Sequence, residues 1–155
     1  MARFRGLQQN VFDYVIYTDG AYSRQHDEGA YAYVMLDKEG NEIKTGAWKI
    51  HFETNQRAEL KAIIKAISHL PEDAMMVKVV SDSLYALNAL AGFWRRNANI
   101  DLFNMFEEIF ADKKDGFKVV YEWVKGHSGN HYNEMCDRMC TEKLGYDCIY
   151  EYKDK

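Results

Sequence analysis

The first half of the chain carries three apolar runs with the length and pattern of β-strands. Residues 11–19 (VFDYVIYTD) are largely apolar on both faces, as in a central strand, and residues 30–36 (AYAYVML) form a second run. A turn signal, Glu-Gly-Asn at 39–41, precedes a third run over 42–52 whose apolar positions alternate near its end. This pattern predicts an antiparallel meander of three strands.

Helical and strand patterns alternate in the rest of the chain. Thr54 is a candidate N-cap, apolar residues recur at helical spacing over 60–67, and Pro71 closes this helix. Further patterns predict a strand over 75–82, helices over 83–95 and from residue 99, a strand over 117–124 and a helix over 131–144. Long helical crossovers imply parallel pairing of the first, fourth and fifth strands. We therefore expect an α/β fold with a mixed sheet and helices on its faces.

Composition indicates a folded domain and restricts the ways in which it can bind nucleic acid. With 155 residues, of which 47% are hydrophobic, the chain suits one domain with a substantial core. The first ten residues have no apolar signal-peptide core, no run is long enough to span a bilayer, and three cysteines suggest reduced thiols. These features predict a cytoplasmic protein. A net charge of −4 means that any contact with nucleic acid must depend on local sites.

Four acidic residues lie where the predicted elements converge. Asp19 and Asp82 end strands that we expect to be parallel neighbours, and ligands bind outside the carboxyl ends of such strands. Glu59 lies beside the apolar stripe of the first long helix, and Asp137 borders that of the last. Clustered carboxylates repel unless cations neutralise them, and oxygen ligands suit Mg²⁺ or Mn²⁺. The spacing alone does not distinguish this metal site from ordinary solubilising acids.

Five segments carry a resemblance to a known family. They are YTDGA at 17–21, TNQRAEL at 54–60, SDS at 81–83, NIDLF at 99–103 and WVKGHSGNHYNEMCDRMC at 123–140. Through them the chain resembles type 1 ribonuclease H over roughly residues 14–144. The resemblance implies a ribonuclease H-like fold, with a five-stranded mixed sheet in the order 3-2-1-4-5 and helices on both faces. It also implies endonucleolytic cleavage of the RNA strand of RNA–DNA hybrids, leaving 5′-phosphate and 3′-hydroxyl ends.

The resemblance also implies a catalytic set. Asp19, Glu59, Asp82 and Asp137 would hold two Mg²⁺ ions, for which Mn²⁺ can substitute, and Asp19 would bridge the two ions. His127, on a mobile loop, would assist proton transfer or product release. Without the surrounding motif, His127 would be interpreted as an exposed loop histidine.

Substrate contacts follow from the same resemblance. The implied residues are Asn55 and Gln56 for 2′-hydroxyls, Thr54 and Asn99 for a DNA phosphate, and Tyr85 and Phe93 for the DNA-strand channel. Asn99 also fits as the cap of a helix, whose backbone N–H groups attract anions. For the two aromatic residues, a place in the core is an equally good interpretation of their spacing.

Two segments depart from the family pattern. SRQHDEG at 23–29 replaces an Asn-Pro-Gly-rich loop, and GFWRRNA at 92–98 replaces a basic, tryptophan-rich protrusion, of which Arg95 and Arg96 remain. A form without the protrusion should bind hybrid more weakly unless other basic residues compensate. The candidates are Arg3, Arg5, Arg24 and Lys49.

We expect the chain to divide into an N-terminal extension (1–10), a catalytic domain (11–146) and a C-terminal tail (147–155), and we expect a monomer.

Three alternatives remain open: the same site acting on double-stranded RNA or DNA, a non-catalytic nucleic-acid-binding module, and a zinc site. The zinc site would use His127, His131, Cys136 and Cys140, although both cysteines fall on a predicted buried stripe. The presence of all four acids favours an active enzyme over a binding module.

Overall fold

The computed structural model describes residues 12–146, which form one five-stranded sheet with helices. In chain order the elements are β1 (Tyr14–Ser23), β2 (Glu28–Asp37), β3 (Glu42–His51), α2 (Asn55–Ser68), β4 (Met76–Ser81), α3 (Leu84–Ala91), α4 (Ile100–Ala111), β5 (Lys118–Trp123) and α5 (His131–Leu144). The strand order is β3-β2-β1-β4-β5. The first three strands pair antiparallel, and β4 pairs parallel with both β1 and β5. The predicted element order and mixed sheet are confirmed.

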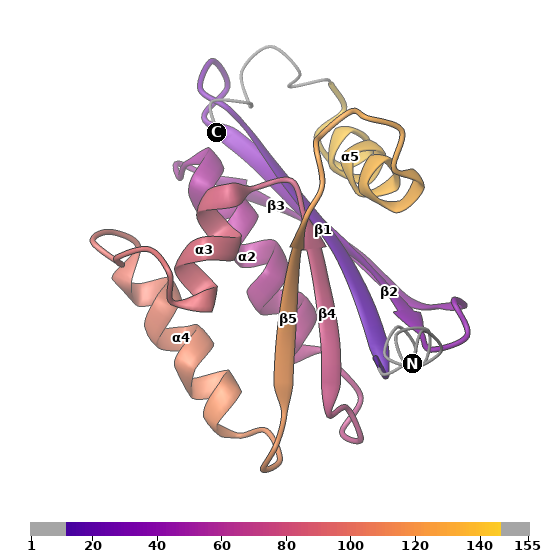
Figure 1. Cartoon of the computed structure of the whole chain (residues 1–155). Coiled ribbons are helices and arrows are strands. Elements are labelled where there is room, and N and C mark those ends of the chain that lie inside the picture. Colours follow the sequence, from indigo (N-terminus) through magenta and orange to yellow (C-terminus); the bar gives the residue numbers. More distant parts are fainter. Residues whose placement is uncertain (1–11, 147–155) are drawn as a thin grey trace.

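Helices cover both faces of the sheet (Figure 1). On one face, α2, α3 and α4 enclose the main core, in which Ile16, Leu60 and Phe103 are almost fully buried. On the other face α5 packs alone, and its Cys136 and Cys140 are buried against β1 and β2. No helix within residues 12–146 is both long and apolar enough to cross a membrane.

The ends of α2 agree with the sequence. The Thr54 side chain accepts a hydrogen bond from the backbone N–H of Arg57 at 3.1 Å, which makes Thr54 the N-cap. The helix ends at Ser68, His69 is its C-cap, and Pro71 follows two residues later. Proline cannot continue a helix, so its position separates α2 from β4.

The helix α3 is shorter than predicted. We expected it to extend to residue 95, but it ends at Ala91 because Gly92 adopts a left-handed conformation with φ of 89°. The guanidinium of Arg96 then donates hydrogen bonds to the carbonyls of Ala89 and Leu90. It also pairs with Glu107 of α4 at 2.6 Å. The guanidinium of Arg96 is thus engaged in contacts within the fold.

The strand β1 is longer than predicted. We expected it to end at Asp19, but its antiparallel pairing with β2 continues to Ser23, opposite Glu28. Its parallel pairing with β4 stops earlier, at the pair of Tyr17 and Val80. Asp19 therefore does not end the strand. It lies at the point where β1 continues with β2 and loses β4 as a neighbour.

Candidate active site

Asp19 and Asp82 lie beside each other at the split between β1 and β4. The last parallel pair joins Tyr17 to Val80, and each acid follows its member of that pair by two residues. Tyr17 and Ala21 both pack in the cluster under α5. Because side chains alternate along a strand, Asp19 points to this same face. The register of β1 against β4 thus explains why these two acids lie side by side.

Glu59 reaches the same place from α2, on the opposite face of the sheet. The contact between α2 and β1 depends on Gly20, because a Cβ there would lie 2.7 Å from both the carbonyl carbon of Ala58 and the nitrogen of Glu59. Any larger residue would push the helix away from the strand. The glycine after Asp19 therefore brings Glu59 to the strand that carries that acid.

Asp19, Glu59 and Asp82 form a compact acidic group. One oxygen from each carboxylate lies within 4.8 Å of the others, and the residues are only 1%, 1% and 7% exposed. Buried carboxylates at this spacing repel one another unless a cation lies among them. An all-oxygen donor set suits a hard divalent cation such as Mg²⁺ or Mn²⁺. The residues present therefore fit the expected metal site.

Asp137 is not among the three carboxylates that lie within 4.8 Å of one another, and it is partly buried on α5. Two neighbouring cysteines attach α5 to β1: the Cys136 thiol donates to the carbonyl of Tyr17 at 3.3 Å, and the Cys140 thiol to that of Asp19 at 3.8 Å. The helix therefore holds Asp137 on the same face of the sheet as Asp19.

The zinc interpretation finds no support in residues 12–146. Burial, followed by the negative charge of Asp19, raises the pKa of the Cys136 and Cys140 thiols well above their usual range. Zinc binds cysteine as a thiolate, which these surroundings disfavour. Within this range, the one group of three or more side chains spaced to hold a metal ion is the acidic group.

The loop between β5 and α5 contacts the acidic group directly. A Cβ on Gly126 would lie 2.5 Å from Oδ2 of Asp82, so the loop backbone is packed against that carboxylate. The indole N–H of Trp123, just before the loop, donates to the carbonyl of Asp82 at 3.1 Å. The next residue after Gly126 is His127, which is exposed and has φ of 55°. The histidine is thus one residue from a contact with the acids, while the mobility of its loop stays a prediction.

Asn99 lies at the start of α4, where the sequence predicted a helix cap. It occupies the N-cap position of α4 but makes no side-chain capping bond, and its backbone is left-handed with φ of 59°. Its amide instead donates to the hydroxyl of Tyr85 at 2.9 Å and accepts from the guanidinium of Arg57 at 3.3 Å. The prediction that Asn99 caps a helix is therefore confirmed by its position, while its amide is held by two partners that are distant in sequence.

Arg57 and Asp101 form a clamp that we did not expect from the sequence. The guanidinium donates two hydrogen bonds to the carboxylate, at 2.9 and 2.7 Å, and joins the N-terminal parts of α2 and α4. These bonds lower the pKa of Asp101 to about 2. Arg57 also lies 2.9 Å from Glu53, whose pKa is lowered by Lys61 and Arg57 although burial opposes the shift. The position of Arg57, directly after the TNQ segment, is the one signal in the sequence that could have indicated it.

The remaining predicted contact residues differ in exposure. Thr54 and Gln56 are exposed at the start of α2, and Asn55 is partly buried between them. Tyr85 is partly buried and packs against the main core, as the alternative interpretation allowed. Phe93 is 81% exposed just after α3 and is available for a ligand.

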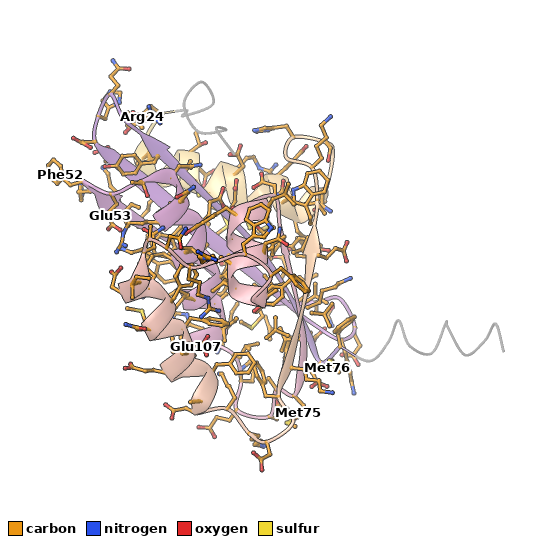
Figure 2. All side chains as sticks on the ribbon, turned by 60° about the vertical axis from the view of Figure 1, so that its left-hand side comes forward. Arg24, Phe52, Glu53, Met75, Met76 and Glu107 are labelled. Carbon is orange, nitrogen blue, oxygen red and sulfur yellow. The ribbon has the colours of Figure 1, made fainter. Side chains whose placement is uncertain are left out.

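The candidate basic residues are also distributed unevenly. Arg24 is exposed at the tip of the β1–β2 hairpin (Figure 2), whereas Lys49 pairs with Glu28 at 3.2 Å. Arg3 and Arg5 lie outside the described residues. Of the four candidates, Arg24 is therefore the one that the described structure leaves at an exposed tip.

A mixed sheet in the order β3-β2-β1-β4-β5 with buried carboxylates at the β1–β4 split defines an α/β protein with a candidate divalent-metal site. The ribonuclease H family model matches residues 12–144, so this chain belongs to the ribonuclease H family and is an enzyme of that class. Among its relatives are a ribonuclease H from Treponema denticola, 31% identical over 82% of this chain and 94% of the relative, and a ribonuclease HI from Synechocystis, 34% identical over 81% and 84%.

A solved structure agrees with the fold. The N-terminal ribonuclease H domain of a Mycobacterium tuberculosis protein, determined as a fusion with maltose-binding protein, superimposes with a TM-score of 0.73. The match covers 86% of this chain and 94% of that chain at 19% identity. At this identity, the likeness concerns the arrangement of the elements alone.

Proposed function

We propose that this ribonuclease H is an endonuclease that hydrolyses the RNA strand of RNA–DNA hybrids and leaves 5′-phosphate and 3′-hydroxyl ends. The observation that carries the proposal is the buried group of Asp19, Glu59 and Asp82, whose oxygens lie within 4.8 Å of one another. Membership of the ribonuclease H family supports the choice of substrate.

The acidic residues would hold two Mg²⁺ ions, with Asp19 shared between them and Glu59, Asp82 and Asp137 as the other ligands. When bound, the ions would supply activation of a water and stabilisation of the oxygen that leaves a phosphodiester. Mn²⁺, which accepts the same oxygen ligands, can substitute. The position of Asp137 on α5, on the face to which Asp19 points, supports its inclusion.

His127 would serve proton transfer or product release. Its exposure leaves the imidazole accessible to solvent, and the contact of Gly126 with Asp82 keeps the residue beside the acids. An imidazole nitrogen can accept and release a proton near neutral pH, which suits either role.

The start of α2 would bind both strands of the hybrid. The amides of Asn55 and Gln56 can hydrogen-bond 2′-hydroxyls, which distinguish RNA from DNA. The hydroxyl of Thr54 and the amide of Asn99 would contact a DNA phosphate, and Arg57 holds that amide through a hydrogen bond at 3.3 Å. Tyr85 and Phe93 would lie along the DNA strand, and the 81% exposure of Phe93 supports its part in this.

We further propose that residues 11–146 are the catalytic domain of a cytoplasmic monomer without a basic protrusion. The short segment between α3 and α4 and the internal bonds of Arg96 support the last point. The buried free thiols of Cys136 and Cys140 are consistent with a reducing compartment.

A cleavage assay tests the function. The same labelled RNA is offered as an RNA–DNA hybrid, as an RNA duplex and as a single strand, with Mg²⁺ and with chelator, and Asp82→Asn is the inactive control. We expect Mg²⁺-dependent cutting of the hybrid alone, and none by the folded variant. Cutting of the RNA duplex would favour the double-stranded alternative. No cutting by the folded wild type would favour the binding module, and near-normal turnover of Asp82→Asn would refute the assigned site.

A further inference from the structure

Phe52, at the turn between β3 and α2, combines two unusual features. Its side chain is 81% exposed, and its backbone lies in the left-handed region with φ of 57°. Bulky residues rarely adopt this conformation, because the Cβ clashes with the backbone, and glycine or asparagine would avoid that cost. Large aromatic side chains are also seldom left in water. Strained, exposed residues of this kind are concentrated at functional sites.

The β1–β2 hairpin holds Phe52 in this conformation. The backbone N–H of Phe52 donates to the carbonyl of Asp27 at 3.0 Å. The buried hydroxyl of Tyr22 donates to the carboxylate of Asp27 at 3.0 Å and accepts from the backbone N–H of Glu53 at 2.8 Å. Two hydrogen bonds between hairpin and turn, and a third within the hairpin that orients the Tyr22 hydroxyl, therefore keep the strained residue in place.

The residue after Phe52 is also fixed. The carboxylate of Glu53 lies 2.6 Å from the ammonium of Lys61 and 2.9 Å from the guanidinium of Arg57, both on α2. The side chains in both ion pairs are only partly exposed, by 19–25%. The Phe52 ring thus projects from a turn that is anchored on both sides, so little backbone entropy would be lost on binding.

The position of Phe52 places it beside the proposed substrate contacts. It precedes Thr54 by two residues, a span of at most roughly 7 Å. Glu59 follows Thr54 by five residues, or about 7.5 Å along the helix. Figure 2 shows Phe52 directed into solvent, with Arg24 at the same end of the molecule and Met75 and Met76 at the other. The ring is therefore within reach of a duplex that binds at the start of α2.

We propose that Phe52 is a further substrate-contact residue, whose ring packs against the sugars of the hybrid in its minor groove, next to Asn55 and Gln56. This inference rests on the proposed function. The wide, shallow minor groove of an A-like duplex exposes sugar faces, which an aromatic ring can cover without reading the sequence. Such a contact adds affinity without requiring a positive charge. The chain has a net charge of −4, and Arg96 and Lys49 already form ion pairs with glutamates of the same chain.

The test separates binding from folding. Phe52→Gly removes the ring and the backbone strain together, so its melting temperature should be no lower than that of the wild type. In an Asp82→Asn background with Mg²⁺, hybrid binding should weaken about fivefold or more, the effect of losing one aromatic contact with nucleic acid. Phe52→Trp should bind like the parent. Ile43→Ala, which removes a 40% exposed apolar side chain at the start of β3, is the matched control.

Salt dependence identifies the kind of contact. Because the ring carries no charge, Phe52→Gly should leave the slope of log Kd against log salt unchanged. Tyr22→Phe keeps a buried ring but removes the hydroxyl that joins hairpin and turn, so it should weaken binding by less than Phe52→Gly does. Equal hybrid affinity of Phe52→Gly and the parent would overturn the proposal. So would a changed salt slope, because it would indicate lost phosphate contacts instead.

Failure of this inference differs from failure of the proposed function. If the hybrid is not the substrate, the wild type itself fails to cut it. If only the inference is wrong, the wild type and Phe52→Gly cut and bind hybrid equally well.

Discussion

At the scale of single residues, the site depends on a glycine that allows the backbone to lie close to a carboxylate. Gly126 lets the loop before α5 lie against the carboxylate of Asp82, where a Cβ would come within 2.5 Å of an oxygen. His127 follows directly and is exposed. The histidine is therefore positioned by its neighbour, while its own side chain stays accessible to solvent.

His127→Ala should slow turnover by about 10²-fold or more, the usual effect of losing a positioned acid or base, and leave hybrid affinity near that of the wild type. Single-turnover and steady-state kinetics, with a binding assay in parallel, measure both quantities. His131→Ala, at another exposed histidine four residues along, is the control and should keep the wild-type rate. An unchanged rate for His127→Ala would leave it an exposed loop histidine without a catalytic role.

At the scale of elements, two contacts hold α2 where the site needs it. Gly20 brings the helix against β1, and the ion pair of Arg57 with Asp101 joins its first turn to α4. The contact at Gly20 is steric, so an added side chain should disrupt it. The ion pair is electrostatic, so low pH should disrupt it.

Gly20→Ala should push α2 away from β1 and displace Glu59, because the added Cβ would lie 2.7 Å from backbone atoms. We expect a loss of about 1–3 kcal/mol in the free energy of unfolding, as for other overpacked sites, together with loss of cleavage. Denaturant unfolding and the hybrid assay measure the two effects. Gly40→Ala adds a Cβ in open space at φ of 87°, so it should lose stability but keep activity. Equal activity of the two variants would argue against the steric role of Gly20.

Asp101→Asn should change how stability depends on pH. Hydrogen bonds from Arg57 lower the pKa of Asp101 from 3.8 to about 2, so the stabilisation is complete above pH 4 and is lost as the pH falls toward 2. Melting temperatures between pH 2 and 7 should therefore fall less steeply in the variant than in the wild type below pH 4. Parallel profiles would mean that the ion pair is screened by solvent and contributes nothing measurable.

At the scale of the whole molecule, the site exists because the sheet divides. β1 continues with β2 after β4 has ended, and acids from β1, from the end of β4 and from α2 meet in the space between them. Elements from both faces of the sheet contribute, so the folded state holds negative charges together that the unfolded chain keeps apart.

This arrangement predicts opposite effects of Asp82→Asn with and without metal. Without divalent cations the variant should melt at a higher temperature than the wild type, because one repelling charge is gone. Mg²⁺ should raise the melting temperature of the wild type, by an amount equivalent to about 2.7 kcal/mol at one hundred times the Kd, and that of the variant much less. Thermal melts in Mg²⁺ and in a monovalent salt of equal ionic strength measure this. An equal Mg²⁺ effect on both proteins would place the cation elsewhere.

The sequence by itself determined the succession of helices and strands and the parallel pairing, whereas the strand order and the set of four acids were inferred from the resemblance to ribonuclease H. Hydrophobic periodicity marks each helix and strand, because it reflects which face of an element is buried. The length of the helical crossovers then requires parallel pairing of the first, fourth and fifth strands. Thr54 and Pro71 mark the limits of α2 by local chemistry, which needs no tertiary contact.

Only the tertiary structure decided how these parts meet. Arg57 and Asp101 are 44 residues apart, and the contact of Gly20 with α2 likewise joins separate elements. The continuation of β1 past Asp19 depends on β2, and the internal role of Arg96 depends on the end of α3 and on Glu107. Each of these features arises from groups brought together by the packing of the whole chain, so hydrophobic periodicity and local capping chemistry did not predict them.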